Sequence, residues 1–199
     1  ECGLECNLID RLIVSTDCER IASVARDHGA EVPFIRPKEL ATDEAHMLPV
    51  LQHAVLKAEE RYAEQVDCLI LIDPTAPLRS VDDLTGALEL FRSKDCDAVF
   101  SGSVARRNPY FNMVQEKGGY YTLVNNSTQS IGRRQDAPQV YDLNTIVFIY
   151  TRAAVMEQKS RIPEKTLLYE ISVDRAIDLD TELDFIFLDF ILSRGGTML

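Results

Sequence analysis

Three aspartates have the type and spacing that metal-assisted chemistry requires. Asp178 and Asp180 form an Asp-x-Asp pair, and in an extended segment the alternation of side chains places both carboxylates on one face. Asp73 directly follows the aliphatic run 69–72, at the end of a predicted strand. Two carboxylates on one face repel each other unless a cation or a basic group lies between them, and Mg²⁺ prefers a few carboxylates plus phosphate oxygens. The alternative is capping, with Asp73 and Asp178 capping turns and Asp180 capping the last helix.

Arginines are the second set of residues that could do chemistry. They lie at predicted strand ends and in polar loops: Arg36, Arg79, Arg106, Arg107, Arg133 and Arg134. A guanidinium group binds phosphate or carboxylate through two parallel hydrogen bonds, so these are candidates for anion recognition, with a surface ion pair as the alternative for each. No third ligand accompanies His46 and His53, and no Gly-x-Ser-x-Gly turn is present. We therefore expect structural or exposed histidines.

The elements that must position these side chains alternate between strand and helix. The run 69–72 is typical of a strand buried on both faces in the centre of a parallel sheet, and the two prolines that follow end it. Ser80-Val81-Asp82-Asp83 has the form of a capping box at the start of a helix. Other strands are expected at 11–17, 31–35, 98–101 and 144–150, and helices at 18–28, 48–62, 80–93 and 181–193. This order predicts an α/β fold, Rossmann-like, with three α/β/α layers and a mainly parallel sheet.

The alternation stops at residue 105. Two aromatic-rich segments, 110–114 and 120–124, flank Gly118-Gly119 and predict a β-hairpin. A lone two-stranded ribbon cannot bury so many aromatic residues, which favours a dimer interface within 105–140. The helix 181–193 is apolar nearly all round, so we expect it to be covered on most sides and to stop at Gly195. We predict one domain over 1–199, with 105–140 as a dimerisation excursion.

Composition excludes several classes of protein. A formal charge of −11 over 199 residues argues against a nucleic-acid surface. No apolar run reaches the length of a membrane span, so we expect no membrane association. The five cysteines are scattered and odd in number, which favours reduced thiols and a cytoplasmic protein. Residues 1–10 look like the frayed end of a helix.

Five segments taken together resemble the acylneuraminate cytidylyltransferase family. They occur in family order over nearly the whole chain, at 13–17, 34–43, 71–79, 133–138 and 177–185. The most specific are Ile72-Asp73-Pro74-Thr75-Ala76-Pro77-Leu78-Arg79 and Ile177-Asp178-Leu179-Asp180-Thr181. The resemblance implies CTP and an acidic nine-carbon sugar as substrates, Mg²⁺ as cofactor, release of pyrophosphate, and a homodimer whose hairpin region completes the neighbouring sugar pocket.

The resemblance also assigns roles to individual residues. Arg36 and Ala45 match positions that contact the cytidine. Asp178 and Asp180 match the carboxylates that bind metal at the phosphates, with Asp180 as a catalytic residue. Asp73 stands where many members have Gln, and either this carboxylate or a metal-bound water is a candidate to take the proton from the attacking sugar hydroxyl.

The sugar side of the expected site departs from the family pattern. Arg134 and Asn144 match positions that contact the sugar. Asp142 stands where a sialic acid synthetase commonly has Arg, and Thr145 where Gly is common. Losing an Arg and gaining acids near an anionic sugar favours an acceptor related to N-acetylneuraminate, or a sugar with an added amino group.

The family's Gly-rich basic loop, of the Ala-Arg-x-Gly-Ser-Lys type, has no counterpart in residues 1–10. That loop follows a central strand and holds the CTP triphosphate. We therefore expect a chain that starts at Glu1 to lack CTP turnover and to expose apolar surface, which a rearranged sheet, a partner chain or the helix 181–193 must then cover. The alternative function is a catalytically inactive dimeric binding or structural module of the same fold.

Overall fold

A four-stranded sheet lies at the centre of the computed structural model, which describes residues 1–125, 131–157 and 160–193. Its order is β1–β5–β2–β6, formed by β1 (Cys68–Leu71), β2 (Ala98–Val104), β5 (Tyr141–Thr151) and β6 (Thr166–Glu170). Strand β5 is antiparallel to both β1 and β2, whereas β2 and β6 are parallel. Three of the four strands therefore run in one direction, and the predicted α/β class is confirmed.

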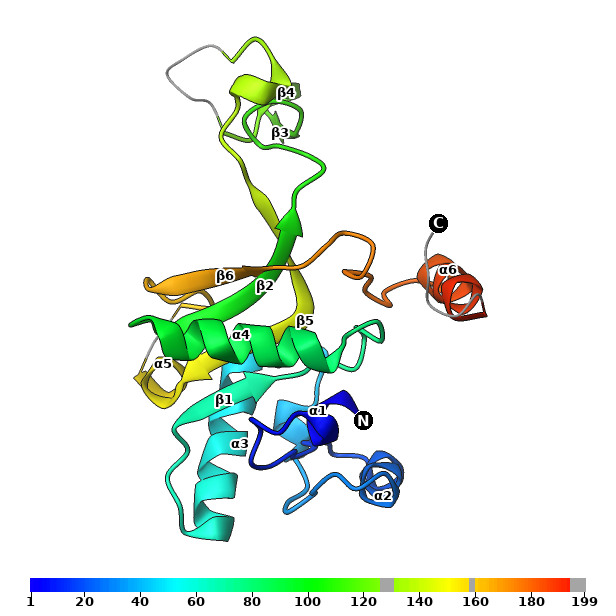
Figure 1. The fold of residues 1–199 in the computed structure, drawn as a ribbon. Coiled ribbons are helices and arrows are strands. Elements are labelled where there is room, and N and C mark those ends of the chain that lie inside the picture. The colour runs from blue at the N-terminus through cyan, green and yellow to red at the C-terminus, as the bar shows by residue number, and fades with distance from the viewer. Residues whose placement is uncertain (126–130, 158–159, 194–199) are drawn as a thin grey trace.

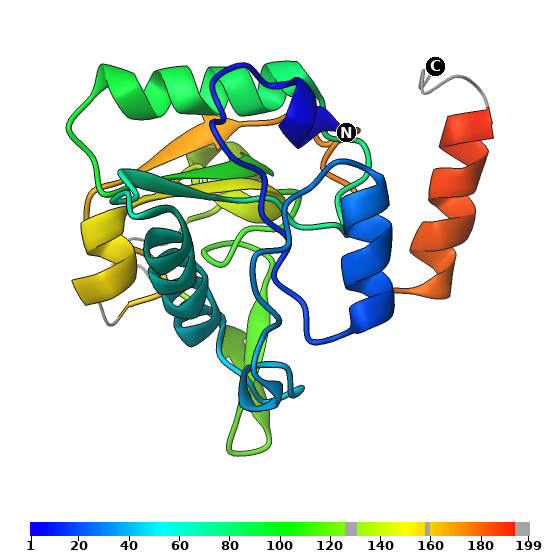
Figure 2. The ribbon, with the colours of Figure 1, turned by 90° about the horizontal axis from the view of Figure 1, so that it is seen from below.

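Helices cover both faces of this sheet (Figures 1 and 2). Helix α4 (Val81–Ser93) packs on one face, where Leu84 and Leu88 meet Val99 and Val147. Helices α3 (Met47–Tyr62) and α5 (Arg152–Glu157) cover the other face, in a second cluster that contains Leu51, Val55, Phe100, Phe148 and Val155. Neighbouring residues of β2 and β5 point to opposite clusters because side chains alternate along a strand. The three predicted layers are confirmed.

The expected position of the run 69–72 is wrong. Among the described strands, β1 lies at the edge of the sheet and pairs only with β5, in antiparallel register. Its four residues are half-buried, with Leu69 and Leu71 on the α3 side and Ile70 on the α4 side. An aliphatic run reports that both faces are covered, but it carries no information about whether both edges are paired.

The N-terminal segment also differs from expectation. Residues 2–9 are packed rather than frayed, since α1 (Cys2–Glu5) contacts α4 and Cys6 is buried in the α4-side cluster. The strands expected at 11–17 and 31–35 reduce to one parallel bridge between Ile13 and Glu31. Helix α2 (Glu19–Asp27) lies between them, as predicted, and the short helix η1 (Lys38–Leu40) precedes α3.

The hairpin is confirmed and stands away from the body of the molecule (Figure 1). Strands β3 (Val114–Lys117) and β4 (Tyr120–Leu123) are joined by Gly118 and Gly119, whose φ angles of 63° and 83° are in the left-handed region that glycine tolerates. The ends of β2 and β5 form its stem, and the short helix η2 (Arg134–Asp136) lies on the returning segment. Residues 126–130 of the predicted excursion are outside the described residues.

The last helix, α6 (Glu182–Ser193), forms where the sequence predicts it but is not covered. Leu188 and Ile191 are buried, whereas Leu183, Phe185, Ile186 and Phe190 are each more than half exposed. It does not fill the sheet edge beside β1, and the expectation that it would be enclosed within this chain is wrong. Its expected stop, Gly195, lies outside the described residues. None of the described helices is long and apolar enough to cross a membrane.

Candidate active site

Asp73 shapes a tight turn directly after β1. Its Oδ1 accepts hydrogen bonds from the Thr75 backbone N–H at 3.1 Å and from the Thr75 hydroxyl at 3.0 Å. This is the geometry by which an Asp side chain holds a turn two residues ahead. The capping alternative is therefore correct for one oxygen of Asp73, and the turn presents Thr75 toward the neighbouring loop.

Thr75 brings Asp178 to the same place. Its hydroxyl lies 3.0 Å from Asp178 Oδ1 as well as 3.0 Å from Asp73 Oδ1, so the two carboxylate oxygens are at most about 6 Å apart. The Leu179 backbone N–H donates to the Thr75 carbonyl at 2.9 Å, which fixes the two chain segments side by side. Residues 105 positions apart in sequence thus converge at the carboxyl end of β1, where α/β sheets bind ligands.

A β-bulge supplies the third wall of this cluster. The register between β2 and β5 shifts between Phe100 and Gly102, which places extra residues of β5 near 144–146. The bulge aims the Thr145 hydroxyl at Asp178, to which it donates a hydrogen bond. Asp178 therefore accepts from two threonine hydroxyls, one in the turn after β1 and one on β5, rather than capping a local turn.

Arg79 connects the β1 turn to the β5 bulge through hydrogen bonds to backbone carbonyls of both segments. Its guanidinium donates to the carbonyls of Asp73 at 2.7 Å and Thr145 at 2.9 Å, and to that of Ile146. Burial lowers the pKa of Arg79 from its ordinary value, and the negative charges of nearby Asp73 and Asp178 oppose this shift. The sequence offered anion recognition or a surface ion pair for this residue, whereas the structure uses it to satisfy buried carbonyls.

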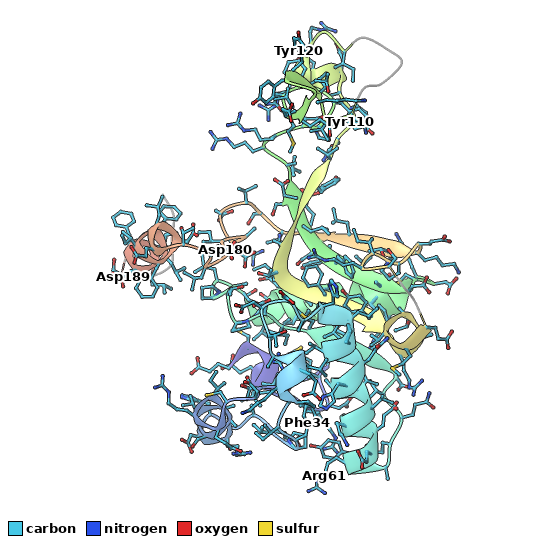
Figure 3. The ribbon with its side chains drawn as sticks, turned by 180° about the vertical axis from the view of Figure 1, so that it is seen from behind. Phe34, Arg61, Tyr110, Tyr120, Asp180 and Asp189 are labelled. Carbon is cyan, nitrogen blue, oxygen red and sulfur yellow. The ribbon has the colours of Figure 1, made fainter. Side chains whose placement is uncertain are left out.

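Among the described residues, no hydrogen bond links the Asp180 side chain to Asp73 or Asp178, and its convergence with them stays a prediction. Asp180 is exposed on the connection that leads into α6, and Figure 3 shows it there. The helix is capped by Thr181 and Asp184 instead: Asp184 Oδ2 accepts from the Thr181 N–H at 2.8 Å and from the Asp180 N–H at 3.2 Å. The alternative that Asp180 caps α6 is wrong, because the residue after it takes that role.

The carboxylate pair fits a magnesium ion that is completed by substrate. Among the described residues, no three His, Cys, Asp or Glu side chains are placed to share a metal ion. Mg²⁺ does not require such a cage, because it is commonly bound by one or two carboxylates, water and substrate phosphates. Asp73 and Asp178 are two carboxylates that share the Thr75 hydroxyl as a neighbour, and Asp180 is two residues from Asp178 on a loop.

The residues matched to the cytidine side lie on a separate loop before α3. Arg36 donates to the hydroxyl of Ser15 at 3.2 Å and to its carbonyl, so its guanidinium is fixed against the end of segment 11–17. Ala45 is half-buried, and its N–H donates to the Thr42 carbonyl at 3.0 Å. Within the described residues, no hydrogen bond or ion pair links Arg36 to Asp73 or Asp178.

The two residues matched to the sugar side lie in different environments. Asn144 is 7% exposed, and its amide donates to Ser103 Oγ at 3.2 Å inside the bulge. Arg134 is exposed on η2, donates to the Arg106 carbonyl at 2.8 Å, and lines an open hollow of about 410 Å³ at the hairpin stem. The structure therefore does not bring the two together, and their roles stay predictions.

Sequence reasoning missed the groups that connect the site. Thr75 belongs to the motif at 71–79 and Thr145 stands where Gly is common, but nothing in a single sequence says that both hydroxyls reach Asp178. It also missed Arg175, which pairs with the buried Asp83. The available signal was an Asp at the third position of a capping box together with an Arg three residues before Asp178.

His53 is half-buried against the loop that carries Arg36. Its ring meets Phe34 edge to face with centroids 5.1 Å apart, and its Nδ1 is buried without a hydrogen-bond partner among the described residues. Burial lowers the pKa of His53, and the positive charges of Lys57 and Arg36 lower it further. The packing of the ring against Phe34 agrees with the structural role expected from sequence.

Comparison with known proteins defines first the class and then the family. The fold matches that of CMP:2-keto-3-deoxy-manno-octonic acid synthetase, a structure determined with CTP, with a TM-score of 0.68, 12% identity, and coverage of 98% of this chain and 85% of that one. At this identity the likeness shows the fold alone, an α/β architecture. A family model described as cytidylyltransferase matches residues 2–190.

Two Campylobacter proteins are similar over nearly the whole chain. Post-translational flagellin modification protein B of Campylobacter coli is 36% identical, over 94% of this chain and 79% of that protein. CMP-N,N'-diacetyllegionaminic acid synthase of Campylobacter jejuni is 38% identical, over 94% of this chain and 78% of that protein. The chain belongs to the cytidylyltransferase family, as the motifs predicted.

Proposed function

We propose that this protein transfers CMP from CTP to an acidic nine-carbon sugar and releases pyrophosphate. The observation that carries the proposal is the Asp73–Thr75–Asp178 cluster at the carboxyl end of β1, in a chain that belongs to the cytidylyltransferase family. In the reaction, the sugar hydroxyl oxygen forms a bond to the α-phosphorus of CTP. The bond from that phosphorus to the bridging oxygen breaks, and pyrophosphate leaves.

The acceptor that we favour is N,N'-diacetyllegionaminic acid or a close relative. The C. jejuni synthase named for that sugar is 38% identical to this chain, whereas N-acylneuraminate cytidylyltransferase of Streptococcus agalactiae is 28% identical. The acidic residue Asp142, in place of the Arg expected for a sialic acid synthetase, supports the same preference. Pseudaminic acid is the main competitor, because the enzyme named for it in C. jejuni is also 28% identical.

Two carboxylates are proposed to hold Mg²⁺ together with the CTP phosphates. Asp178 and Asp73 provide them, and Asp180 is placed on the same loop to contribute once substrate is bound. Bound Mg²⁺ neutralises the charge that develops on the phosphates. Asp73 is also a candidate to take the proton of the attacking hydroxyl, whereas Arg36 and Ala45 are proposed to face the cytidine.

The test is pyrophosphate release with CTP, Mg²⁺ and a panel of nonulosonic acids, measured on a version that carries the family's Gly-rich loop, because a chain that starts at Glu1 is expected to lack turnover. We expect turnover with a legionaminic acid derivative that exceeds turnover with N-acetylneuraminate, loss of turnover with EDTA, and little with UTP. Absence of turnover with every acid in the panel would contradict the proposal. Asp180→Asn should sharply lower turnover, and a variant with unchanged turnover and metal dependence would remove Asp180 from the mechanism.

A homodimer built on 105–140 is also proposed. Tyr120 and Tyr121 at the hairpin tip are 78% and 73% exposed, and Figure 3 shows Tyr110 and Tyr120 far from the sheet. Large exposed aromatics are the residues enriched at interfaces. Light scattering at micromolar concentration should give twice the chain mass of 22.4 kDa, and a monomer would contradict this proposal.

We propose a cytoplasmic location because the cysteines form no disulfide bonds. All five are free, and burial raises the pKa of the Cys68 and Cys96 thiols, which keeps these two protonated. Free thiols of this kind persist in reducing compartments.

A further inference from the structure

We infer that Arg175 is a positioning residue for Asp178 and acts through an ion pair with Asp83. The inference rests on the proposed function, because holding Asp178 in place affects the reaction only if that carboxylate binds the metal ion. It concerns the connection from β6 to α6, residues 171–181, which Figure 1 shows leaving the sheet toward α6.

Asp83 is a buried carboxylate that requires a partner. It is 1% exposed and forms the capping box of α4, where its Oδ2 accepts from the Ser80 N–H at 2.9 Å and the Ser80 hydroxyl at 2.8 Å. Two neutral donors do not balance a full charge removed from water. A capping box alone needs no burial of this kind, so the position of Asp83 is explained by something else that it binds.

Arg175 is that partner. Its Nη1 lies 2.7 Å from Asp83 Oδ1 and 2.6 Å from Oδ2, so one nitrogen bridges both oxygens. Its backbone N–H donates to the Ser172 carbonyl at 3.1 Å, so Arg175 is held within its own turn as well. The hydrogen bond to Asp83 raises the pKa of Arg175, which is the shift expected of a working ion pair.

The ion pair is the middle of three attachments along the connection. At its start, the Ile171 N–H donates to the Gly102 carbonyl of β2 at 2.8 Å. At its end, Leu179 and Asp178 bond to Thr75. Arg175 lies between these points and is the only side chain among the described residues of 172–177 that forms an ion pair.

Asp73 and Asp178 are thereby both connected to the N-terminal end of helix α4. The segment 76–80 connects the turn that Asp73 and Thr75 form to helix α4, which begins at Val81. Arg175 ties the Asp178 loop to the first turn of that same helix. Without the ion pair, the connection is still attached at Ile171 and at Leu179. It loses its middle attachment, which lies outside the proposed metal site.

The chain offers a matched control in Glu59 and Arg152. This ion pair is also formed at both carboxylate oxygens, at 2.6 and 2.9 Å, and joins α3 to α5 on the other face of the sheet. Breaking it with Arg152→Gln should lower stability with no effect on Asp178. The variants for the inference are Arg175→Gln, which removes the charge, and Arg175→Lys, which keeps the charge but not the planar fork.

Two readouts separate positioning from general stability. One is the dissociation constant of Mn²⁺ in the presence of CTP, measured by electron paramagnetic resonance. The other is the hydrogen-exchange rate of the Leu179 amide, which donates to Thr75. We expect Arg175→Gln to weaken Mn²⁺ binding about 10- to 100-fold, as the loss of outer-shell support usually does, and to speed exchange at Leu179. Arg175→Lys should give a smaller change in the same direction, and it remains informative if Arg175→Gln does not fold.

Unchanged Mn²⁺ affinity and unchanged Leu179 exchange in a folded Arg175 variant, with melting lowered as in Arg152→Gln, would overturn the inference. So would an equal loss of Mn²⁺ affinity in Arg152→Gln. Failure of the proposed function looks different, because the unmodified protein would then neither bind Mn²⁺ with CTP nor release pyrophosphate.

Discussion

The cluster around Asp178 and the hairpin at 105–140 differ in whether their side chains find partners within the chain. At the cluster, polar groups from the β1 turn, the β5 bulge and the 171–181 connection satisfy one another within the chain. At the hairpin, Tyr120 and Tyr121 are exposed. The difference teaches that hydrogen-bond demands are met by a few well-placed atoms, whereas burying aromatic area requires a large facing surface, which one chain of this shape does not supply.

The strongest way to break this comparison is to remove a charge from the cluster. Asp178→Asn should lower turnover at least about 100-fold if Asp178 is the metal ligand proposed above, because loss of a ligand should cost more than loss of an outer-shell partner. The amide still accepts from Thr75 and Thr145, so melting should change little. The control is Asp189→Asn on exposed α6, and steady-state pyrophosphate release is the measurement. Equal turnover in both variants would show that Asp178 holds no metal.

The hairpin side is tested by replacing its tyrosines. Tyr120→Ser combined with Tyr121→Ser should weaken a dimer about 30-fold, the effect of losing about 2 kcal/mol at an interface anchor. The stability of the monomer should be unchanged, because both side chains are exposed within the chain. Analytical ultracentrifugation over a concentration series measures the dissociation constant. A wild-type dissociation constant in the double variant would place the interface elsewhere.

The Thr75 hydroxyl, which contacts both Asp73 and Asp178, can be removed by a single substitution. Thr75→Val removes the hydroxyl that lies 3.0 Å from both Asp73 and Asp178 and keeps the shape of the side chain. Turnover should fall about 10-fold, and stability by about 1 kcal/mol, the usual contribution of a hydrogen bond. Thr75→Ser is the matched control and should retain both properties. If Val and Ser behave alike in turnover and melting, the hydroxyl does not organise the site.

His53 is a useful contrast to the Asp178 cluster, where polar groups are paired, because its buried Nδ1 lacks a hydrogen-bond partner among the described residues. Its pKa is lowered by burial, with Lys57 and Arg36 adding to the shift and Glu39 opposing it. Below about pH 6.5 the unfolded chain binds a proton that the folded chain refuses, so stability falls as pH falls, by at most about 1.4 kcal/mol per pH unit. His53→Phe should flatten this slope in urea unfolding between pH 7 and 5, whereas exposed His46→Gln should not. An unchanged slope in His53→Phe would assign the effect to other groups.

Local patterns in the sequence were sufficient to predict much of this protein. The α4 helix with its capping box, the hairpin with its two glycines and the helix of residues 182–193 follow from caps, turn residues and periodicity over a few neighbours. The family motifs predicted the family and placed Asp73 and Asp178 at one end of the sheet. All of these depend on residues close together in the chain or on a motif read as a unit.

The tertiary structure alone decided how distant segments meet. It placed β1 at the sheet edge, left α6 exposed, used Thr75 and Thr145 to join the carboxylates, and paired Arg175 with Asp83. Each of these depends on contacts between residues tens of positions apart, and hydrophobic periodicity reports only that a face is covered. Which segment covers that face, and which polar groups converge, follows from packing the elements together.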